Sequence, residues 1–233
     1  MNVKIEQEFF NVFPNARIGI IVAHGVSNHD TAQENYQALL NDASQKALKH
    51  ISATEWSDNA VIAKWRGAYQ QFKTKKGARS SIEALLKRVQ TGKGVNSISP
   101  LVDVYNSISL EFGVPCGGED MDAIEGDMRL TIAKGDEEFI TYGSDKSEPP
   151  YAGEIIYKDD AGAICRCWNW RESVRTMLTD TTTNAIFVIE DTDADNENFN
   201  LALNTLKERL SFYVKGDYSV AVLDATHSVL ELS

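Results

Sequence analysis

The chain of 233 residues is 42% hydrophobic and 9% aromatic, so it can bury a sizeable core as one large domain or two closely packed ones, which excludes general disorder. Its net charge of −11 excludes a protein that binds nucleic acid over its whole surface, because phosphate recognition depends on Lys and Arg. No window approaches the roughly 18 uninterrupted apolar residues of a membrane-spanning helix, and Met1–Glu8 has no signal-peptide pattern, so we expect a cytoplasmic protein.

The first predicted elements are a strand and a helix. Arg17–Ala23 is a short apolar run that ends before His24, which is typical of a buried strand followed by a turn. Asp30 and Gln33 form a capping pair for the helix that follows, and its apolar residues recur every three or four positions as far as about His50.

Basic residues concentrate in the next segment. Between Asn59 and Ile98 there are nine Lys and Arg residues and one acidic residue, so this segment carries +8 and leaves −19 for the rest of the chain. Such asymmetry predicts one basic face on an acidic body, as expected if a single surface meets RNA; an ordinary solvated helix and loop is the alternative. The candidate RNA-binding residues are Lys73, Lys75, Lys76, Arg79, Lys87 and Arg88.

Two more helices have clear signals. Ser81–Gln90 carries one apolar stripe, and Glu83 stands four residues before Lys87, a spacing that favours an ion pair on a helix. Ser99–Pro100 supplies a hydroxyl cap followed by proline at the first helical position, and Gly113 marks the end of that helix.

From Asp127 the apolar period changes to two, which predicts strands of a sheet. The expected elements are strands at 128–133, 139–142, 154–158, 163–168 and 185–190, a helix at 198–213 and a strand at 219–223. Helices in the first half and strands in the second favour a layered α+β fold, with helices packed on antiparallel or mixed sheets. We expect one domain over residues 1–233, with an N-terminal α/β part (1–95) and a motif-bearing part (96–233).

Cysteine spacing suggests packing rather than chemistry. The three cysteines are an odd number, and Cys165-x-Cys167 has neither zinc-site nor redox spacing. On a strand these two side chains would share one face.

A family resemblance appears in the middle of the chain. Residues 99–124 are similar, in one register without gaps, to the pattern N-x-V-D-V-T-N-Y-V-M-L-E-x-G-Q-P-x-H-A-F-D of the B3/B4 module of the phenylalanyl-tRNA synthetase β subunit. The matching residues are Val102, Asp103, Val104, Asn106, Leu110, Glu111, Gly113, Pro115 and Asp120. Arg129, Gly135–Glu137 and Thr183–Glu190 resemble later elements of the family, so the resemblance covers roughly residues 95–195 well.

In that family the module hydrolyses the ester of wrongly charged tRNA. The resemblance therefore implies a layered B3/B4-type fold and a freestanding editing factor or tRNA-binding relative, too short to be a complete synthetase. The chain departs from the family pattern at Gly117 and Glu119, where the synthetases have histidine and phenylalanine, so specificity for tyrosine is not implied. Gly117–Asp120 and Trp168–Arg171 instead resemble the freestanding branch.

The candidate catalytic residues follow from the chemistry of an aminoacyl ester, which presents an α-ammonium, a carbonyl, a side chain and a ribose hydroxyl. Glu119 and Glu190 are candidates to hold the ammonium or to orient water, because a carboxylate with a pKa near 4.3 is ionised at neutral pH. Asn106 is a candidate to orient the carbonyl or the water by hydrogen bonding.

The candidate substrate-binding residues lie in two short segments. They are Gly117, Gly118, Arg166, Trp168, Asn169, Trp170 and Arg171. The glycines permit close backbone approach, and on a strand the indoles of Trp168 and Trp170 would share one side while Asn169 faces the other. Arg166 and Arg171 are candidates to meet the terminal phosphates or the substrate. Plainer interpretations remain open: Asn106 satisfies neighbouring backbone groups, Glu119 is a solvated turn residue, and Glu190 is part of an acidic strand end. The indoles are then core residues, and the guanidinium groups pair with surface carboxylates.

His24 and His29, with Ser27 and Asp30, invite comparison with a serine triad or a metal site. The segment lacks a nucleophile elbow, and two histidines five residues apart without a third ligand are a weak metal signal. We expect a turn and helix cap here, with no metal and no other cofactor.

Three functions remain open. The first is hydrolysis in trans of a mischarged aminoacyl-tRNA by a positioned water, the second is a non-catalytic module that binds RNA or an amino-acid-like ligand, and the third is a small-molecule hydrolase. The expected partner is the aminoacylated 3′ end of tRNA, without DNA or membrane, and the sequence indicates no oligomeric state. All three functions require Asn106, the turn at Gly117–Glu119 and the strand at Arg166–Trp170 to surround one cavity.

Overall fold

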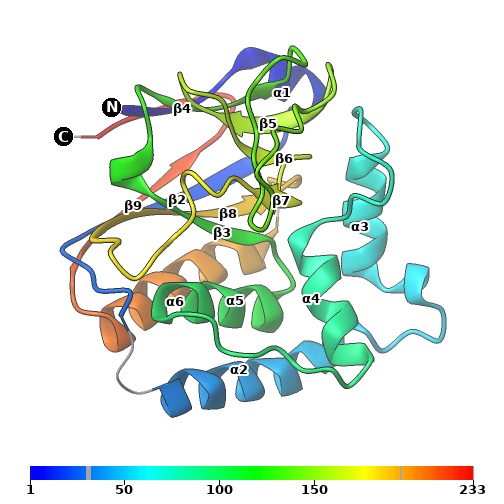
Figure 1. Ribbon diagram of the computed structural model, residues 1–233. Helices are drawn as coiled ribbons and strands as arrows, with labels where there is room; N and C mark the ends of the chain where they lie inside the picture. Colours follow the sequence, from blue (N-terminus) through cyan, green and yellow to red (C-terminus); the bar gives the residue numbers. More distant parts are fainter. Residues whose placement is uncertain (30–32, 195, 233) are drawn as a thin grey trace.

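The computed structural model describes residues 1–29, 33–194 and 196–232, and it stacks two β-sheets and a layer of helices (Figure 1). This arrangement confirms the predicted layered α+β fold. Asp30, expected to cap the second helix, lies outside the described residues. Among those described, no helix combines the length and apolar character needed to cross a bilayer.

The sheets differ in topology. Among the described residues the first sheet is mixed, in the order β10-β1-β4-β5-β6-β7, with β1 and β4 parallel. Its strands are β1 Asn2–Ile5, β4 Met128–Ile132, β5 Ile155–Lys158, β6 Ala163–Arg166, β7 Arg171–Glu172 and β10 Val229–Glu231. The second sheet is antiparallel, in the order β3-β8-β2-β9. Its strands are β2 Arg17–His24, β3 Cys116–Asp120, β8 Asn184–Asp191 and β9 Asp217–Leu223.

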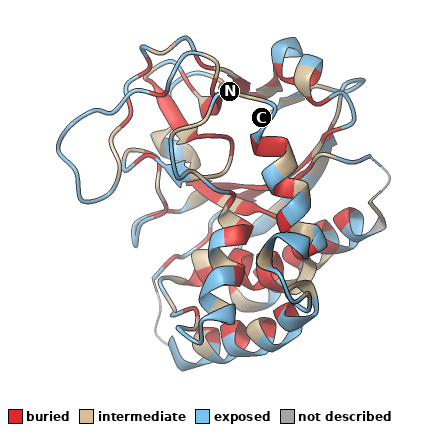
Figure 2. Cartoon of the chain, turned by 90° about the vertical axis from the view of Figure 1, so that its right-hand side faces the viewer, coloured by how far each residue is buried: buried red, intermediate tan, exposed pale blue. Residues whose placement is uncertain are grey.

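Helices α2 to α6 cover one face of the second sheet and one side of the molecule (Figure 1), and the short α1 packs against β4 of the first sheet. They are α1 Gln7–Val12, α2 Gln33–Ala47, α3 Ala60–Tyr69, α4 Ser81–Gln90, α5 Pro100–Phe112 and α6 Glu197–Tyr213. In Figure 1, α5 and α6 lie under the second sheet with α2 below them, while α3 and α4 stand at the side. Figure 2 shows these helices with buried residues facing inward and exposed residues outward.

Strands β2 and β8, at the centre of the second sheet, are buried on both faces, which explains their uninterrupted apolar runs. On β8, Ala185, Phe187 and Ile189 pack with the helices, whereas Ile186 and Val188 pack with the first sheet. A strand covered on both sides gains by being apolar at every position, so the runs predicted as buried strands lie at the centre of the fold.

Helix α5 is the buried axis of the helical layer, and its N-terminal end differs from the expectation. Gly113 ends the helix as predicted, with φ +69°, and an added Cβ would lie 2.9 Å from atoms of both His50 and Val61, so the turn requires glycine. Ser99 makes no side-chain cap, contrary to the prediction. Instead Asn28 reaches across and accepts a hydrogen bond from the backbone nitrogen of Leu101 at 3.0 Å.

Three other local predictions are wrong. The segment Phe139–Tyr142 is a loop, because the Phe139 backbone bonds to Ser147 and Glu148 across a turn instead of to a neighbouring strand. Glu83 pairs with Arg66 at 2.6 Å and not with Lys87. Gly117–Glu119, expected as a turn, lies within strand β3 and pairs with β8.

Candidate functional site

A cavity of about 510 Å³ opens between α4, α5, the edge strand β3 and the turn that joins β6 to β7. It therefore brings together segments from residues 81–190. Its walls are Ser81, Ala84, Leu85, Tyr105, Asn106, Cys116, Gly117, Glu119, Met128, Thr141, Tyr142, Tyr157, Cys165, Trp168, Asn169, Trp170, Arg171, Glu172, Val188 and Glu190. The three segments that a common pocket requires thus surround one hollow. A larger surface groove of about 890 Å³ along α2 contains none of the predicted catalytic, substrate-binding or RNA-binding residues.

The turn from β6 to β7 closes one side of the cavity. Cys167 and Trp168 have φ of 47° and 67°, in the left-handed region that costs a residue with a side chain about 1–2 kcal/mol. Packing holds the turn, because the Trp168 ring lies 5.0 Å from that of Phe9 and 5.2 Å from that of Trp65.

This turn corrects the predicted alternation of tryptophans on a strand. Trp168 is fully buried in the core, Trp170 is half-buried, and Asn169 lines the cavity beside both of them. Cys165 and Cys167 do not share a strand face either, since Cys165 lines the cavity and the Cys167 thiol contacts Glu154 at 3.3 Å.

Glu190 is a buried carboxylate held at both oxygens. The Tyr157 hydroxyl donates to Oε1 at 2.8 Å, and the Asn169 amide donates to Oε2 at 2.5 Å. The Tyr69 hydroxyl donates to the amide oxygen of Asn169 at 3.0 Å and so fixes the orientation of that amide. Burial raises the pKa of Glu190 to about 7, against the lowering effect of its hydrogen bonds, so its proton equilibrium falls near neutral pH.

Glu119 is buried with less support, since the Thr176 hydroxyl and the Arg175 charge only partly oppose the rise in its pKa. Its side chain lines the cavity from β3, it is only 6% exposed, and its Oε2 atom has no hydrogen-bond partner among the described residues. Burial, followed by the nearby charge of Glu172, raises its pKa well above the usual range. A buried carboxylate with an open acceptor atom is costly in isolation.

Most predicted substrate-binding residues reach the cavity, and two do not. Gly117 lines it, whereas a Cβ on Gly118 would meet Phe187 on the opposite face of the sheet. Arg171 lines the mouth, with its guanidinium carbon 5.0 Å from the centre of the Trp170 ring. Arg166 points away into the protein and binds both oxygens of Glu154, at 3.1 and 2.6 Å, so it is not available to a ligand.

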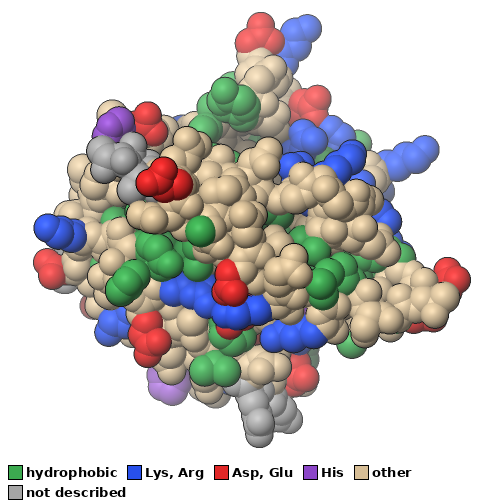
Figure 3. Space-filling model, turned by 90° about the horizontal axis from the view of Figure 1, so that it is seen from below, with side chains coloured by type: hydrophobic (Ala, Val, Ile, Leu, Met, Phe, Trp, Pro, Cys, Tyr) green, Lys and Arg blue, Asp and Glu red, His purple; other side chains and the backbone are tan. Residues whose placement is uncertain are grey.

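The basic segment runs beside the turn but is partly neutralised. Ser81, the residue after the loop of residues 70–80, donates its backbone N–H to the Asn169 carbonyl at 3.1 Å, which anchors the C-terminal end of that loop at the cavity wall. Lys75 pairs with Glu148, and the Lys87 ammonium lies 4.7 Å from the centre of the Trp56 ring. Basic and acidic side chains are interspersed on the helical face in Figure 3, so that face has no single sign of charge.

The other predicted RNA-binding residues lie in the loop before α4 and on α4 itself, and the histidine considered for a metal site lies on β2. Lys73, Lys76 and Arg79 are exposed in the loop, and Arg88 lies on α4, where it donates to the Gly94 carbonyl at 2.9 Å. His24 bonds to Asn184 at 3.0 Å at the end of β2. Over the described residues, no group of three His, Cys, Asp or Glu side chains is arranged to hold a metal ion.

Three tyrosines in or behind the cavity wall had no sequence signal of function. Tyr105 and Tyr157 line the cavity, whereas Tyr69 contacts Asn169 from α3 without lining it. All three lie on helices or strands, where a tyrosine is ordinarily a core residue. Only the fold shows that Tyr157 and Tyr69 hold Glu190 and Asn169.

Comparison with known proteins shows that the chain is similar to one domain family and to part of two ligase subunits. The sequence model of the B3/4 domain matches residues 64–213. The chain is 35% identical over 71 residues to the phenylalanine--tRNA ligase beta subunit of Leifsonia xyli subsp. xyli, and 33% identical over 93 residues to that of Psychrobacter arcticus. These matches cover 30% and 40% of this chain but 8% and 11% of the two ligase subunits, so the chain spans a small part of their length.

A similarity also exists among solved structures. An N-terminal fragment of the phenylalanyl-tRNA synthetase beta subunit from Pyrococcus horikoshii matches with a TM-score of 0.47 and 13% identity. The match covers 93% of this chain and 49% of the fragment.

Proposed function

The chain belongs to the B3/4 domain family, and from this premise we propose that it holds the 3′ end of a mischarged aminoacyl-tRNA in its cavity and hydrolyses the ester in trans. The observation that supports this most is the convergence of Asn106, Glu119 and Glu190 on one hollow. At about 510 Å³, the cavity is within the range of roughly 300–1,000 Å³ typical of small-molecule sites.

Glu190 is the group best suited to activate water. A general base works best when its pKa is near the operating pH, and burial brings the pKa of Glu190 to about 7. In the proposed step, Glu190 accepts a proton as the water oxygen bonds to the ester carbonyl carbon. Glu190 then donates this proton to the ribose oxygen as the bond from the carbon to that oxygen breaks, and the amino acid leaves as a carboxylic acid that loses its proton to solvent.

Asn106 and the glycine edge of β3 serve the carbonyl oxygen in this proposal. Asn106 lines the cavity from the buried helix α5, so its position is set by the core, and its amide has a hydrogen-bond donor for the developing oxyanion. Gly117 lines the same wall without a side chain and lets the ester approach the backbone.

The basic segment supplies the contact with RNA. Lys73, Lys76 and Arg79 are exposed in the loop beside the turn, where they can meet backbone phosphates while the terminal nucleotide enters the cavity. Arg171 stands at the mouth, where a phosphate of the terminal nucleotides would pass.

A second candidate is a binding module without turnover. It is favoured by the departure of Gly117 and Glu119 from the histidine and phenylalanine of the synthetase pattern, because that change rebuilds the wall beside the ester.

Deacylation of a panel of mischarged tRNAs tests the proposal. We expect the protein to release the amino acid from at least one member, with Glu190→Gln lowering the rate by about 10²–10⁴ and Asn106→Ala by a comparable factor. Glu208→Gln, on the exposed side of α6, is the matched control and should leave the rate unchanged. Tight tRNA binding with no deacylation of any member would instead favour the binding module.

A further inference from the structure

A second hollow of about 470 Å³, here called the side pocket, lies beside the cavity between α3, α4 and the loop of residues 70–80. Two contacts cross the wall between them. The Tyr69 side chain lines the side pocket, and its hydroxyl donates to the amide oxygen of Asn169, which lines the cavity. Trp65 also lines the side pocket, and its ring lies 5.2 Å from that of Trp168 in the cavity wall. The two hollows are therefore neighbours that share one wall.

One arginine of the side pocket is held in a fixed orientation. The Arg66 Nε and Nη2 atoms donate to Oε1 of Glu83 at 3.1 and 2.6 Å, and Glu83 is only 5% exposed. The Trp56 indole donates to the same carboxylate oxygen at 3.2 Å and fixes it in turn. The Arg66 side chain is nevertheless 46% exposed, and its Nη1 atom makes no hydrogen bond among the described residues. Only one edge of this guanidinium is therefore used by the protein.

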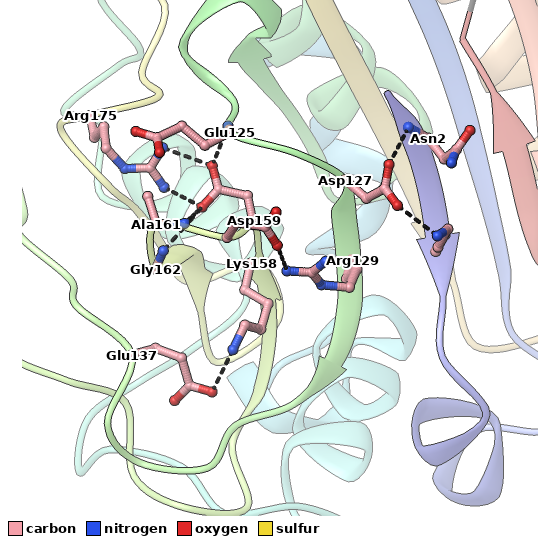
Figure 4. A network of polar contacts seen from close by, with 12 residues as sticks. Asn2, Glu125, Asp127, Arg129, Glu137, Lys158, Asp159, Ala161, Gly162 and Arg175 are labelled. Atoms are coloured by element: carbon pink, nitrogen blue, oxygen red, sulfur yellow. Dashed lines mark hydrogen bonds and ion pairs between the residues drawn. The ribbon is translucent and has the colours of Figure 1, made fainter.

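A different arginine shows what full use of the guanidinium looks like. Figure 4 shows Arg175, whose two terminal nitrogens bind the two oxygens of Asp159 at 2.8 and 2.7 Å. Its Nη1 atom also donates to the Ala123 carbonyl at 3.0 Å. An arginine bound in this way has no terminal edge left for a ligand, whereas Arg66 keeps the edge between Nη1 and Nη2. A free guanidinium edge in a fixed orientation matches two oxygens of a phosphate group.

The rest of the side pocket offers positive charge and unused polar groups. Arg79 is exposed at its rim, and Gln70 and Thr74 add an amide and a hydroxyl. The side chains of these three residues make no hydrogen bond or ion pair with the rest of the described chain. Its charged residues are Arg66, Arg79 and Glu83, so the side pocket carries a net positive charge, whereas the cavity walls carry three glutamates and one arginine.

The size of the side pocket exceeds what a phosphate alone would fill. Its volume of about 470 Å³ falls within the range of roughly 300–1,000 Å³ typical of small-molecule sites. Trp65 and Tyr69 supply aromatic rings, and Gln70 supplies a side-chain amide, which are groups that recognise an unpaired base by stacking and hydrogen bonding. The side pocket thus combines groups that bind a phosphate with groups that bind a base.

We propose that the side pocket binds the nucleotide that precedes the terminal, aminoacylated nucleotide of an RNA 3′ end. The phosphate of this nucleotide lies between the two arginines of the side pocket, and its base lies against Tyr69 and Gln70. The assignment rests on the proposed function for the placement of the terminal nucleotide in the cavity. Because the two hollows share a wall, consecutive nucleotides of one strand occupy them in turn.

Binding of a short RNA tests the inference. The tetranucleotide ACCA, labelled with fluorescein at its 5′ end, is titrated with the protein and followed by anisotropy at several salt concentrations. We expect Arg79→Gln to weaken binding about three- to fivefold and to reduce the dependence of log affinity on log salt by about 0.7, as the loss of one phosphate contact to a single strand does. Gln70→Ala should weaken binding about two- to fivefold without changing the salt dependence, because the amide carries no charge. Lys207→Gln, on the exposed side of α6, removes one charge outside the side pocket and is the matched control.

Two further measurements test the orientation and the position of the nucleotide. Arg66→Lys keeps a cation beside Glu83 but lacks the planar edge, so it should weaken ACCA binding about fivefold or more. Thermal unfolding shows whether each variant is folded. With 4-thiouridine in place of the nucleotide before the terminal adenosine, irradiation should crosslink the RNA to the segment of residues 65–83, identified by mass spectrometry of the digested protein.

Four results would overturn the inference. They are no binding of ACCA, unchanged affinity in both arginine variants, crosslinks only to other segments, and displacement of ACCA by inorganic phosphate as effective as that by unlabelled ACCA. If ACCA binds and crosslinks as expected but no mischarged tRNA is deacylated, the nucleotide site stands and the proposed hydrolysis fails. Deacylation that neither arginine variant alters would instead support the hydrolysis and reject the nucleotide site.

Discussion

Buried carboxylates in two regions of this protein differ in whether a cationic side chain pairs with them. This difference distinguishes a carboxylate that stabilises the fold from one that is available for chemistry. In one region, Glu154 is fully buried and receives two hydrogen bonds from Arg166, so its charge is matched within the chain. In the cavity, Glu119 and Glu190 are also buried, but no guanidinium or ammonium pairs with them among the described residues. A matched buried charge holds the fold, while an unmatched one is tolerated where a ligand supplies the missing charge or a proton is exchanged.

The largest expected effect breaks the matched pair. Glu154→Gln leaves the Arg166 guanidinium buried without its countercharge, and such a change costs about 3–5 kcal/mol. Denaturant unfolding should show this loss. The double variant Glu154→Gln, Arg166→Met should recover much of it, because it removes the uncompensated charge. Equal stability of Glu154→Gln and the wild type would mean that the pair contributes nothing to the fold.

The next largest effect is the pH dependence of stability that the Glu190 carboxyl causes. The pKa of Glu190 is raised from 4.5 to about 7, so between these values the unfolded state has lost a proton that the folded state still holds. Stability should therefore fall as pH rises from about 4.5 to about 7, by about 3 kcal/mol for this group. Glu190→Gln cannot titrate, and its unfolding free energy should lack this part of the decline. Parallel pH curves for the variant and the wild type would contradict the assignment.

Substitution of Glu119 is expected to raise stability, in contrast to the loss of stability expected for Glu154→Gln, and by a smaller amount. Because burial raises the pKa of this carboxyl well above its usual range, the unpartnered charge opposes folding at high pH. Glu119→Gln should stabilise the protein at pH 8 by about 0.5–2 kcal/mol, as removal of a strained functional group often does. Chemical denaturation at pH 8 measures this, and a clear loss of stability would show that Glu119 has a structural partner after all.

The contrast also explains what the sequence could and could not predict. Apolar period and helix signals located α4, α5, β2 and β8, because burial imposes those patterns directly. The family motif singled out Asn106 and Glu190, the chemistry of an aminoacyl ester added Glu119, and the fold brings all three to one cavity.

The sequence could not show which distant side chains Arg166 and Trp168 contact. The residues 163–168 alternate like a strand, yet the strand ends at Arg166 because Cys167 and Trp168 turn with positive φ to bury the indole among Phe9, Phe13 and Trp65. That turn sends Arg166 to Glu154, and only the distant chain segments decide it. The short helix α1 and the short strands β1 and β10 also lacked a signal, since a few residues carry little periodicity.

The smallest effect applies the same distinction to the surface. Lys75 is paired with Glu148, whereas Lys76, one residue on, is exposed and forms no ion pair among the described residues. If this loop contacts tRNA, a lysine with a protein partner has less charge to offer a phosphate than one without. We expect Lys76→Gln to weaken tRNA binding about three- to fivefold and to reduce the dependence of log affinity on log salt by about 0.7–0.9, as the loss of one phosphate contact does. Lys75→Gln, the matched control, should change affinity less than twofold. Fluorescence anisotropy with labelled tRNA at several salt concentrations gives both numbers. The same small change in both variants would mean that tRNA binds to a surface other than this loop. The distinction between paired and unpaired charges would then apply to the interior of the protein but not to its basic loop.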